Sequence, residues 1–335
     1  MAADLVWVSA DAWDEPGSYS LHPGWLRPVA RRTDTGEVGV LTDAPRSFAL
    51  AAHLDDDGVV RQVYPSSALS LAEPGPAELW RVLAALGRFA DRRGLAVDMR
   101  LAPQLAPALG RALGTPETDG EGWAVDVWED CFFFDSRDSD ADLLRGMSRT
   151  ARQNLRTALR GGLRTCHAPA AVALDAFRDL YSMAMERLAA KPFLVFPRRF
   201  FDEVLAGYGD EPRVVLVHDA AGVPTAATLL LPVDDGYDSW LAGSDARAWS
   251  FRPNNLLFFA AAGFVREAGK ARLYIGGGPR GLDRFKRGLS RNALPSYRLR
   301  RNLSAAQRAR SDERLIPSCR EASDEGAARG SGEAR

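Results

Sequence analysis

The chain has few of the residues that stabilise small folds through covalent or metal bonds. Its 335 residues include only 3 cysteines and 4 histidines. Cys131, Cys166 and Cys319 are odd in number and unrelated in spacing, which indicates neither a disulfide framework nor a metal site. We therefore expect no bound metal and a cytoplasmic location.

Long apolar runs and several familiar catalytic motifs are also missing. No apolar run of about eighteen residues occurs, so no membrane-spanning helix is predicted. The first residues, Met-Ala-Ala-Asp-Leu-Val-Trp, lack the charged and apolar regions of a secretory signal. P-loop, serine-hydrolase and zinc-protease motifs do not occur, so those classes of enzyme have no support. We interpret His167 and His218, beside strand-like or loop segments, as structural residues.

The charges are unevenly distributed along a chain that has ample apolar residues. Hydrophobic residues make up 46% of the sequence, enough for one large core or two ordinary cores. Residues 1–140 carry 12 basic and 23 acidic side chains, whereas residues 141–335 carry 31 and 21, and the formal net charge is −1. The second part can attract an anionic partner, or the two parts can attract each other.

The most informative segment is a run of arginines without acidic neighbours. Six arginines fall between positions 145 and 164, and no Asp or Glu interrupts them. At intervals of three and four residues, they lie on one face of a helix. Such a face repels itself, so we expect an anionic partner. A phosphate-rich ligand and an acidic surface of the same chain are the two alternatives.

Residues 211–300 predict a regular order of strands and helices. Asp/Gly turns separate three short strands, and Pro253 suits the first turn of the helix that follows. The expected elements are strands 214–218, 225–231 and 237–243, helix 253–268, strand 272–275, helix 282–288 and strand 296–299.

Part of this order occurs earlier in the chain, as a helix, a glycine stop, a strand and a short helix over residues 76–113. A hairpin over 47–64 precedes this copy. Strands 123–127 and 131–134 and helices 141–161, 170–190 and 197–207 connect the copies. We expect an acidic domain 1–135, a domain 136–303 opened by the basic helix, and a disordered or loosely docked tail 304–335.

The order meander, helix, strand resembles the Gcn5-related N-acetyltransferase (GNAT) fold, and its doubling is similar to the FemAB/FemX-like aminoacyltransferases. The segment Arg149–Gly161 resembles the arginine helix of that family, and 177–187 resembles its next helix. Residues 237–244 resemble its aromatic strand, with Trp240 where the family often has tyrosine, and Phe285-Lys286 its Phe-Lys pair. The resemblance implies an α/β fold of two GNAT-like units, each a mixed, mostly antiparallel sheet flanked by helices, around a shared cleft.

This resemblance implies transfer of an amino acid from aminoacyl-tRNA to an amine acceptor, either a peptidoglycan precursor or a small metabolite, without a cofactor. The donor ester is already activated, so the protein mainly positions the reactants and stabilises the oxyanion. We expect backbone amides of strand 237–243 to face that oxyanion. The expected residues are catalytic Lys286, Trp240 and Tyr237; substrate-binding Arg187, Phe285, Asn254, Gly276 and Gly277; and tRNA phosphate-binding Arg149, Arg152, Arg156 and Arg160.

Two other functions remain open. A coenzyme A-dependent N-acyltransferase of the same fold would take acetyl-CoA or another acyl-CoA as donor. The segment 244–255 that would hold its phosphates contains no glycine, and Pro253 removes one N–H donor, which disfavours this alternative. A non-catalytic RNA-binding module would keep the basic surface without the chemistry.

Overall fold

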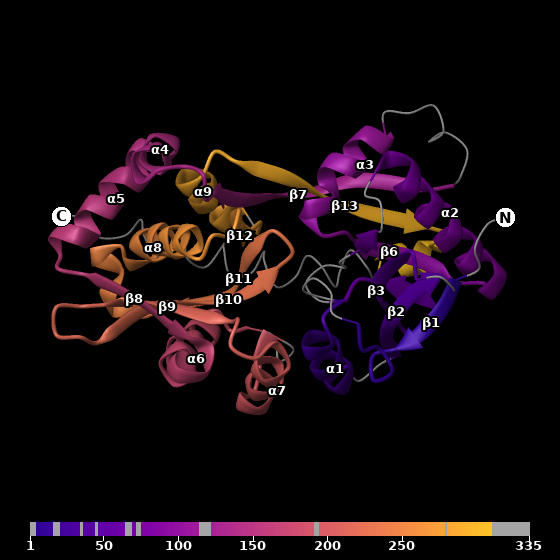
Figure 1. The fold of residues 1–335 in the computed structure, drawn as a ribbon, viewed down its shortest axis with the longest axis horizontal. Helices are drawn as coiled ribbons and strands as arrows, with labels where there is room; N and C mark the ends of the chain where they lie inside the picture. The colour runs from indigo at the N-terminus through magenta and orange to yellow at the C-terminus, as the bar shows by residue number, and fades with distance from the viewer. Residues whose placement is uncertain are drawn as a thin grey trace. The chain divides into compact units, whose positions relative to one another are not determined.

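The computed structural model describes two compact units, drawn in Figure 1, between which the chain passes twice. Unit 1 contains the described residues up to Glu129 and from Leu294 onward, and unit 2 is Asp130–Ala293. Within the described residues, no helix has the length and apolar character needed to cross a membrane. The described ranges are 5–15, 21–33, 36–43, 46–63, 69–71, 75–113, 122–190, 194–278 and 280–309.

Unit 1 is a mixed sheet with strand order β1-β2-β3-β4-β6-β13, in which β5 also pairs with β3. β4 and β6 are parallel, and the other pairs are antiparallel. The elements are β1 (Leu5–Ser9), α1 (Pro23–Arg32), β2 (Glu37–Asp43), β3 (Phe48–Leu54), β4 (Val59–Arg61), β5 (Leu69–Leu71), α2 (Pro76–Arg93), β6 (Ala96–Arg100), η2 (Pro103–Leu105), α3 (Ala106–Leu113) and most of β13 (Ala293–Arg301).

Helix α2 shows how the sequence sets the boundaries of these elements. Pro76 starts the helix, because its fixed φ suits the first turn. Gly94 ends it with φ 64°, a left-handed conformation that glycine adopts without steric cost. Leu79, Leu83 and Leu86 are spaced at helical intervals and are buried in the core of the unit, so α2 is held by one apolar face.

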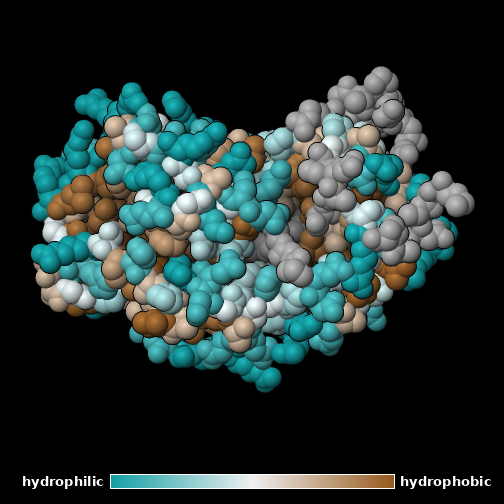
Figure 2. Space-filling model, viewed as in Figure 1, coloured by the Kyte–Doolittle hydropathy of each residue, from teal (hydrophilic) through white to brown (hydrophobic). Residues whose placement is uncertain are grey.

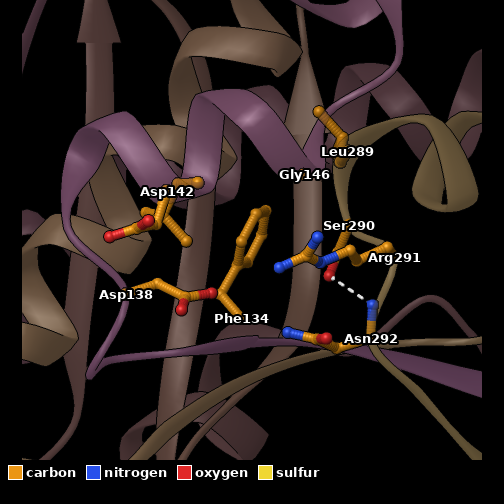
Figure 3. A pocket seen from close by; sticks show the side chains of 9 residues that line it. Phe134, Asp138, Asp142, Gly146, Leu289, Ser290, Arg291 and Asn292 are labelled. Carbon is orange, nitrogen blue, oxygen red and sulfur yellow. Dashed lines mark hydrogen bonds between the residues drawn. The ribbon is translucent and has the colours of Figure 1, made fainter.

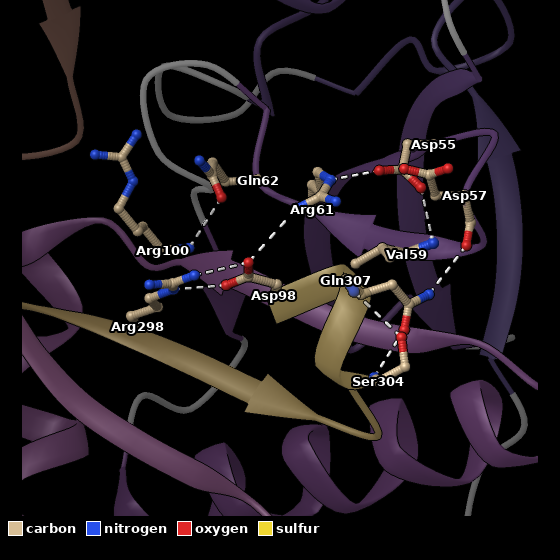
Figure 4. Close-up of polar contacts among 10 residues, drawn as sticks. All are labelled: Asp55, Asp57, Val59, Arg61, Gln62, Asp98, Arg100, Arg298, Ser304 and Gln307. Carbon is tan, nitrogen blue, oxygen red and sulfur yellow. Dashed lines mark hydrogen bonds and ion pairs between the residues drawn. The ribbon is translucent and has the colours of Figure 1, made fainter. Parts of the chain in front are cut away.

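A buried group of ion pairs joins β13 to the sheet of unit 1 (Figure 4). Arg298 Nε lies 2.6 Å from Asp98 Oδ1, and both residues are at most 5% exposed. Arg61 pairs with Asp98 at 3.5 Å and also with Asp55. Because an unpartnered buried charge is costly, these pairs favour one register of β13. Gln307 Nε2 donates to Asp57 O at 3.1 Å, which attaches the following residues to the same unit.

The strands of unit 2 are also mixed in direction and lie in the order β7-β12-β11-β10-β9-β8. Only β11 and β12 are parallel, and the other pairs are antiparallel. The elements are β7 (Ala124–Asp135), α4 (Asp140–Gly146), α5 (Arg149–Arg160), β8 (Arg164–Pro169), α6 (Ala170–Arg187), α7 (Arg198–Tyr208), β9 (Arg213–His218), β10 (Pro224–Val233), β11 (Gly236–Ser244), η5 (Ala246–Phe251), α8 (Pro253–Glu267), β12 (Arg272–Gly276) and α9 (Arg280–Leu289).

Helices cover both faces of this sheet: α8 packs on one face together with α5, and α6 packs on the other (Figure 1). The approach of α6 to β11 depends on Gly243, where a Cβ atom would lie only 2.4 Å from Leu180 O. A side chain at this position would push the helix off the strand. Gly243 therefore allows the middle of α6, at Leu180, to lie close to the end of β11.

The observed fold confirms the predicted α/β class, with a mixed sheet flanked by helices. Most of the predicted helices and strands occur, but the single helix expected over 141–161 is wrong. Two helices replace it, because Ser148 Oγ accepts a hydrogen bond from Ala151 N and starts α5 anew. The two strands expected between 123 and 134 form one strand, β7.

The division of the chain also differs from the predicted domains. The last strand, expected in the domain 136–303, returns to unit 1, where it pairs with β6. The first boundary lies at Glu129 rather than near residue 135. Residues 304–309 of the expected tail are in contact with unit 1, and the rest of that tail lies outside the described residues.

Candidate active site

The two parallel strands of unit 2 part at the position where the sequence predicted the site. Gly236–Asp238 of β11 pair with Arg272–Tyr274 of β12, and the register ends there. β12 then reaches Gly276, whereas β11 continues to Ser244 alongside β10. The backbone of β11 beyond Asp238 is therefore not paired with β12, and polar groups gather around the parting strands.

Asp238 lies at the last residue pair of these strands and is half-buried. Burial raises the pKa of its carboxyl to about 7, while the positive charge of Lys286 acts in the opposite direction. On α7, the pKa of the Tyr208 hydroxyl is raised first by burial and then by the negative charge of Asp238. Asp238 is thus a partly exposed residue whose carboxyl is surrounded by protein and has a pKa near neutral pH.

Lys286 and the two glycines predicted beside it come together. Lys286, on α9, donates a hydrogen bond from Nζ to Gly277 O. Gly276 has φ 68°, and a Cβ atom there would lie 3.4 Å from Lys286 Nζ. The glycines therefore let the chain after β12 pass close to the ammonium group.

A second polar group forms at the end of β11. Arg187, the last residue of α6, donates from Nη1 to Ser244 O at 3.1 Å, and its guanidinium lies 4.6 Å from the ring centre of Trp249. Burial lowers the pKa of Arg187, and the charge of Asp245 raises it. Asn254 Nδ2 and Trp249 Nε1 donate to Ser244 Oγ at 3.3 and 3.1 Å. Arg187 and Asn254, both predicted as substrate-binding, thus both hydrogen-bond to Ser244.

Three predicted aromatic residues belong instead to the packing of unit 2. Tyr237 is 5% exposed, and its hydroxyl donates to Glu211 O at 3.1 Å, so this side chain is engaged in packing and its catalytic role stays a prediction. Trp240 is 9% exposed and lies among aromatic rings of α7 and the segment before it. Phe285 packs against Phe258, with ring centres 6.0 Å apart. All three side chains thus make packing contacts within unit 2.

The arginine face of α5 is only partly as predicted. Arg145 lies on α4 and pairs with Asp142, and Arg152 is half-buried and donates to backbone carbonyls at the end of α4. Arg149, Arg156 and Arg160 are exposed. Among the residues that the structure describes, no carboxylate lies within ion-pair distance of these three or of Arg152. The alternative of an internal acidic partner therefore has no support in the described part of the chain.

A shallow pocket elsewhere in unit 2 contains none of the predicted residues (Figure 3). Its empty volume is about 200 Å³, including space open to solvent. Ser290 on its wall donates to Phe133 O and accepts from Asn292 N, so its hydroxyl is satisfied within the protein. We do not assign the site to this pocket. It is lined by Phe134, Asp138, Asp142, Leu143, Gly146, Leu289, Ser290, Arg291 and Asn292.

Comparison with known proteins gives the class of this unit. Residues 145–287 match the acetyltransferase (GNAT) domain family, which confirms the GNAT domain predicted for the second half. The matched segment runs from the end of α4 through α9 and includes Arg187, Asp238 and Lys286. No curated protein matches the chain.

Solved structures extend the likeness to nearly the whole chain. FemX is 12% identical with a TM-score of 0.56, covering 88% of this chain and 96% of its own. The C-terminal domain of a putative lysylphosphatidylglycerol synthetase from Agrobacterium fabrum is 16% identical with a TM-score of 0.58, covering 87% and 95%. L-PGS from Bacillus licheniformis is 14% identical with a TM-score of 0.58, covering 90% and 99%. The predicted resemblance is confirmed: the chain has the FemX-like tandem GNAT fold.

Proposed function

We propose that this protein transfers an aminoacyl group from aminoacyl-tRNA to an amine acceptor and forms an amide bond. The observation that carries the proposal is the arginine face of α5. Arg149, Arg156 and Arg160 are exposed without an ion pair to a described carboxylate. Guanidinium groups in this state favour phosphates, which RNA supplies in a row.

In this proposal, the catalytic groups lie where β11 and β12 separate. The acceptor amine attacks the ester carbonyl and loses a proton, which Asp238 beside the attacking nitrogen accepts. The ester C–O bond then breaks, and the ribose oxygen of the tRNA leaves as a hydroxyl with that proton. General bases work best when their pKa lies near the working pH, and burial holds the pKa of the Asp238 carboxyl at about 7. The backbone N–H groups of β11 that lie beyond its pairing with β12 then stabilise the oxyanion that forms on the ester carbonyl.

Lys286 and Arg187 bind the acceptor in this proposal. Both are cations at the edge of the same strand, one near Asp238 and one at Ser244. They suit an acceptor that carries phosphate or carboxylate beside its amine, such as a peptidoglycan precursor or a small metabolite. Among the structural relatives, the name lysylphosphatidylglycerol synthetase describes a product with a lysyl group on a phospholipid.

A coenzyme A-dependent N-acyltransferase is the second candidate, favoured by the match to an acetyltransferase domain. Against it, the segment between β11 and α8 folds as η5 rather than as a glycine loop, and Pro253 occupies the first position of α8. This helix therefore offers one N–H fewer to a diphosphate.

The two donors are separated by product analysis. The purified protein is incubated with a candidate acceptor mixture and either a pool of charged tRNAs or acetyl-CoA, and products are identified by mass spectrometry. We expect an aminoacylated product that ribonuclease treatment abolishes. An acetylated product from acetyl-CoA alone supports the second candidate. RNA binding without product from either donor indicates a non-catalytic RNA-binding module.

A further inference from the structure

Two aromatic rings stand on the surface of unit 2. Trp249 is 43% exposed and Phe251 is 45% exposed, and they are the only aromatic side chains among the large hydrophobic residues exposed in the described part of the chain. Both belong to η5, the short helix between β11 and α8. Their exposure leaves apolar area in water, which a bound ligand would cover.

Both rings are held in place. Trp249 Nε1 donates to Ser244 Oγ at 3.1 Å, and the Arg187 guanidinium covers part of the ring at 4.6 Å from its centre. Phe251 lies against Gly161, where a Cβ atom would come within 2.8 Å of its Cδ1. A rigid ring loses little entropy when a flat group stacks on it.

The surroundings of the rings are basic. Gly161 directly follows Arg160 of α5, and Arg252 directly follows Phe251. Arg160 and Arg252 are exposed, and neither lies within ion-pair distance of a carboxylate that the structure describes. In the space-filling view, hydrophobic residues reach the surface beside hydrophilic side chains at the α5 end of unit 2 (Figure 2). We call Arg156, Leu159, Arg160, Trp249, Phe251 and Arg252 the aromatic–arginine surface.

We propose that the aromatic–arginine surface binds the unpaired nucleotides at the 3′ end of the donor RNA. This inference rests on the proposed aminoacyl-tRNA donor, because the aminoacyl ester is carried by that end. Arginines bind the phosphates of single-stranded RNA, while aromatic rings stack on its bases whatever their sequence. A paired stem hides its bases and gains only the arginine contacts.

An anionic membrane surface is the competing occupant, since it also combines apolar and negative groups. The fixed rings favour the nucleotides. Trp249 is hydrogen-bonded through its indole nitrogen and partly covered by a guanidinium, and Phe251 lies against Gly161. Such rings offer flat faces for stacking rather than free tips for insertion into lipid.

The test compares two RNA hairpins with the same stem, one blunt and one with four unpaired 3′ nucleotides. Their dissociation constants are measured by fluorescence anisotropy with the full chain. We expect Trp249→Leu and Phe251→Leu each to weaken binding of the overhanging hairpin about tenfold and to leave the blunt hairpin unchanged. Phe251→Tyr keeps a ring and should bind like the wild type, as should Val172→Ala, which changes an exposed apolar residue on α6.

Four outcomes overturn the inference, and one of them also contradicts the proposed function. Equal losses for both hairpins, in variants whose circular dichroism matches the wild type, exclude stacking on unpaired bases. Phosphatidylglycerol vesicles that bind the wild type but not the aromatic variants, with RNA binding unchanged, assign the surface to lipid. If the wild type binds neither hairpin, the aminoacyl-tRNA donor fails as well. Wild-type affinity for both hairpins in every aromatic variant overturns only the present inference.

Discussion

Asp238 combines three properties that rarely occur together in a side chain with no function. It lies within β11, among residues that are mostly apolar, at the point where β11 and β12 cease to pair. Its carboxyl is surrounded by protein, which disfavours the charged form, yet part of the residue remains accessible. Lys286 compensates only part of that cost. Strongly perturbed carboxyls with a nearby cation are frequent at active sites.

The first prediction concerns the pH dependence of turnover. Since only the carboxylate accepts a proton, kcat/KM of the wild type should rise with pH through about 7, the pKa of Asp238, and then level off. Asp238→Asn should lower kcat/KM at neutral pH by about a hundredfold or more and remove this rise. Steady-state rates between about pH 5.5 and 8.5 provide the measurement. A variant that keeps the wild-type profile excludes Asp238 as the base.

The second prediction concerns stability and does not depend on the reaction. The folded chain binds the Asp238 proton more tightly than the unfolded chain, so this group lowers the free energy of unfolding as pH rises from about 4 to about 7. Asp238→Asn removes that cost. We expect the variant to be more stable than the wild type at about pH 8, by about 1–3 kcal/mol, and by less at about pH 5. Urea unfolding at both values measures the difference; a gain that is larger at the lower pH contradicts the assigned environment.

The third prediction separates Lys286 from the other basic residues of α9. Lys286→Ala should reduce kcat/KM by about tenfold to a hundredfold, mainly through KM for the acceptor, because the ammonium group that binds the acceptor is removed. Arg284 is exposed on the same helix and makes a matched control, with Arg284→Ala expected to retain acceptor KM. An unchanged acceptor KM in the Lys286 variant removes this role.

For individual side chains, the sequence predicted the positions of the cationic residues better than those of the aromatic residues. Lys286, Gly276 and Gly277 lie together, since β12 ends at Gly276 and α9, which carries Lys286, begins only four residues later. The burial of Tyr237 was not predicted, because the face of a strand on which a ring lies depends on neighbouring helices that are absent from a local pattern. Asp238 was missed, although an acid inside an apolar strand was visible.

Helix α5 is the element on which the donor assignment depends. Its apolar face, Ala151, Leu155 and Ala158, is buried in the core of unit 2, which leaves Arg156 and Arg160 exposed at the other side. The helix therefore exposes cations that make no ion pair with a carboxylate in the described part of the chain. Its expected fusion with α4 was wrong because a serine cap within a basic run is a weak signal in the sequence.

The fourth prediction tests this helix through salt dependence. Removal of one phosphate-binding arginine should reduce the slope of log K against log salt by about 0.7 to 0.9. We expect Arg156→Ser with Arg160→Ser to weaken RNA binding and to lower the slope by about 1 to 2, measured by anisotropy between about 50 and 200 mM salt. Arg199→Ser, on α7, is the control, since Arg199 pairs with Glu203. An equal slope in both variants places the RNA elsewhere.

Edge strands were the elements that the sequence predicted least well. β8 reads Arg-Thr-Cys-His-Ala-Pro and lies mostly exposed at the end of the sheet of unit 2, paired only with β9 among the described strands. Alternation of apolar and polar residues is absent there, so the pattern resembled a loop. β1 and β2 were not predicted either. β2 lies between β1 and β3, and its consecutive buried residues give no period of two.

In the whole molecule, the chain crosses twice between unit 1 and unit 2. Among the residues that the structure describes, the buried cluster of unit 2 runs from Phe132 to Leu289. The core of unit 1 needs Leu299 of β13, and Asp98 needs Arg298. No local pattern revealed this return, because the buried arginine and its carboxylate are 200 residues apart in the sequence.

This asymmetry gives the last prediction, which compares fragments of the chain. Residues 130–293 should unfold cooperatively in urea, because they retain the buried cluster from Phe132 to Leu289 and the pairing of Phe132–Asp135 with β12. Residues 1–129 alone should show no cooperative transition, since β6 would lack one of its two partner strands and Asp98 its buried arginine, at a cost of about 3–5 kcal/mol. Joining residues 294–309 to them through a Gly/Ser linker should restore the transition. Cooperative unfolding of residues 1–129 without β13, followed by circular dichroism, contradicts the role assigned to the returning strand.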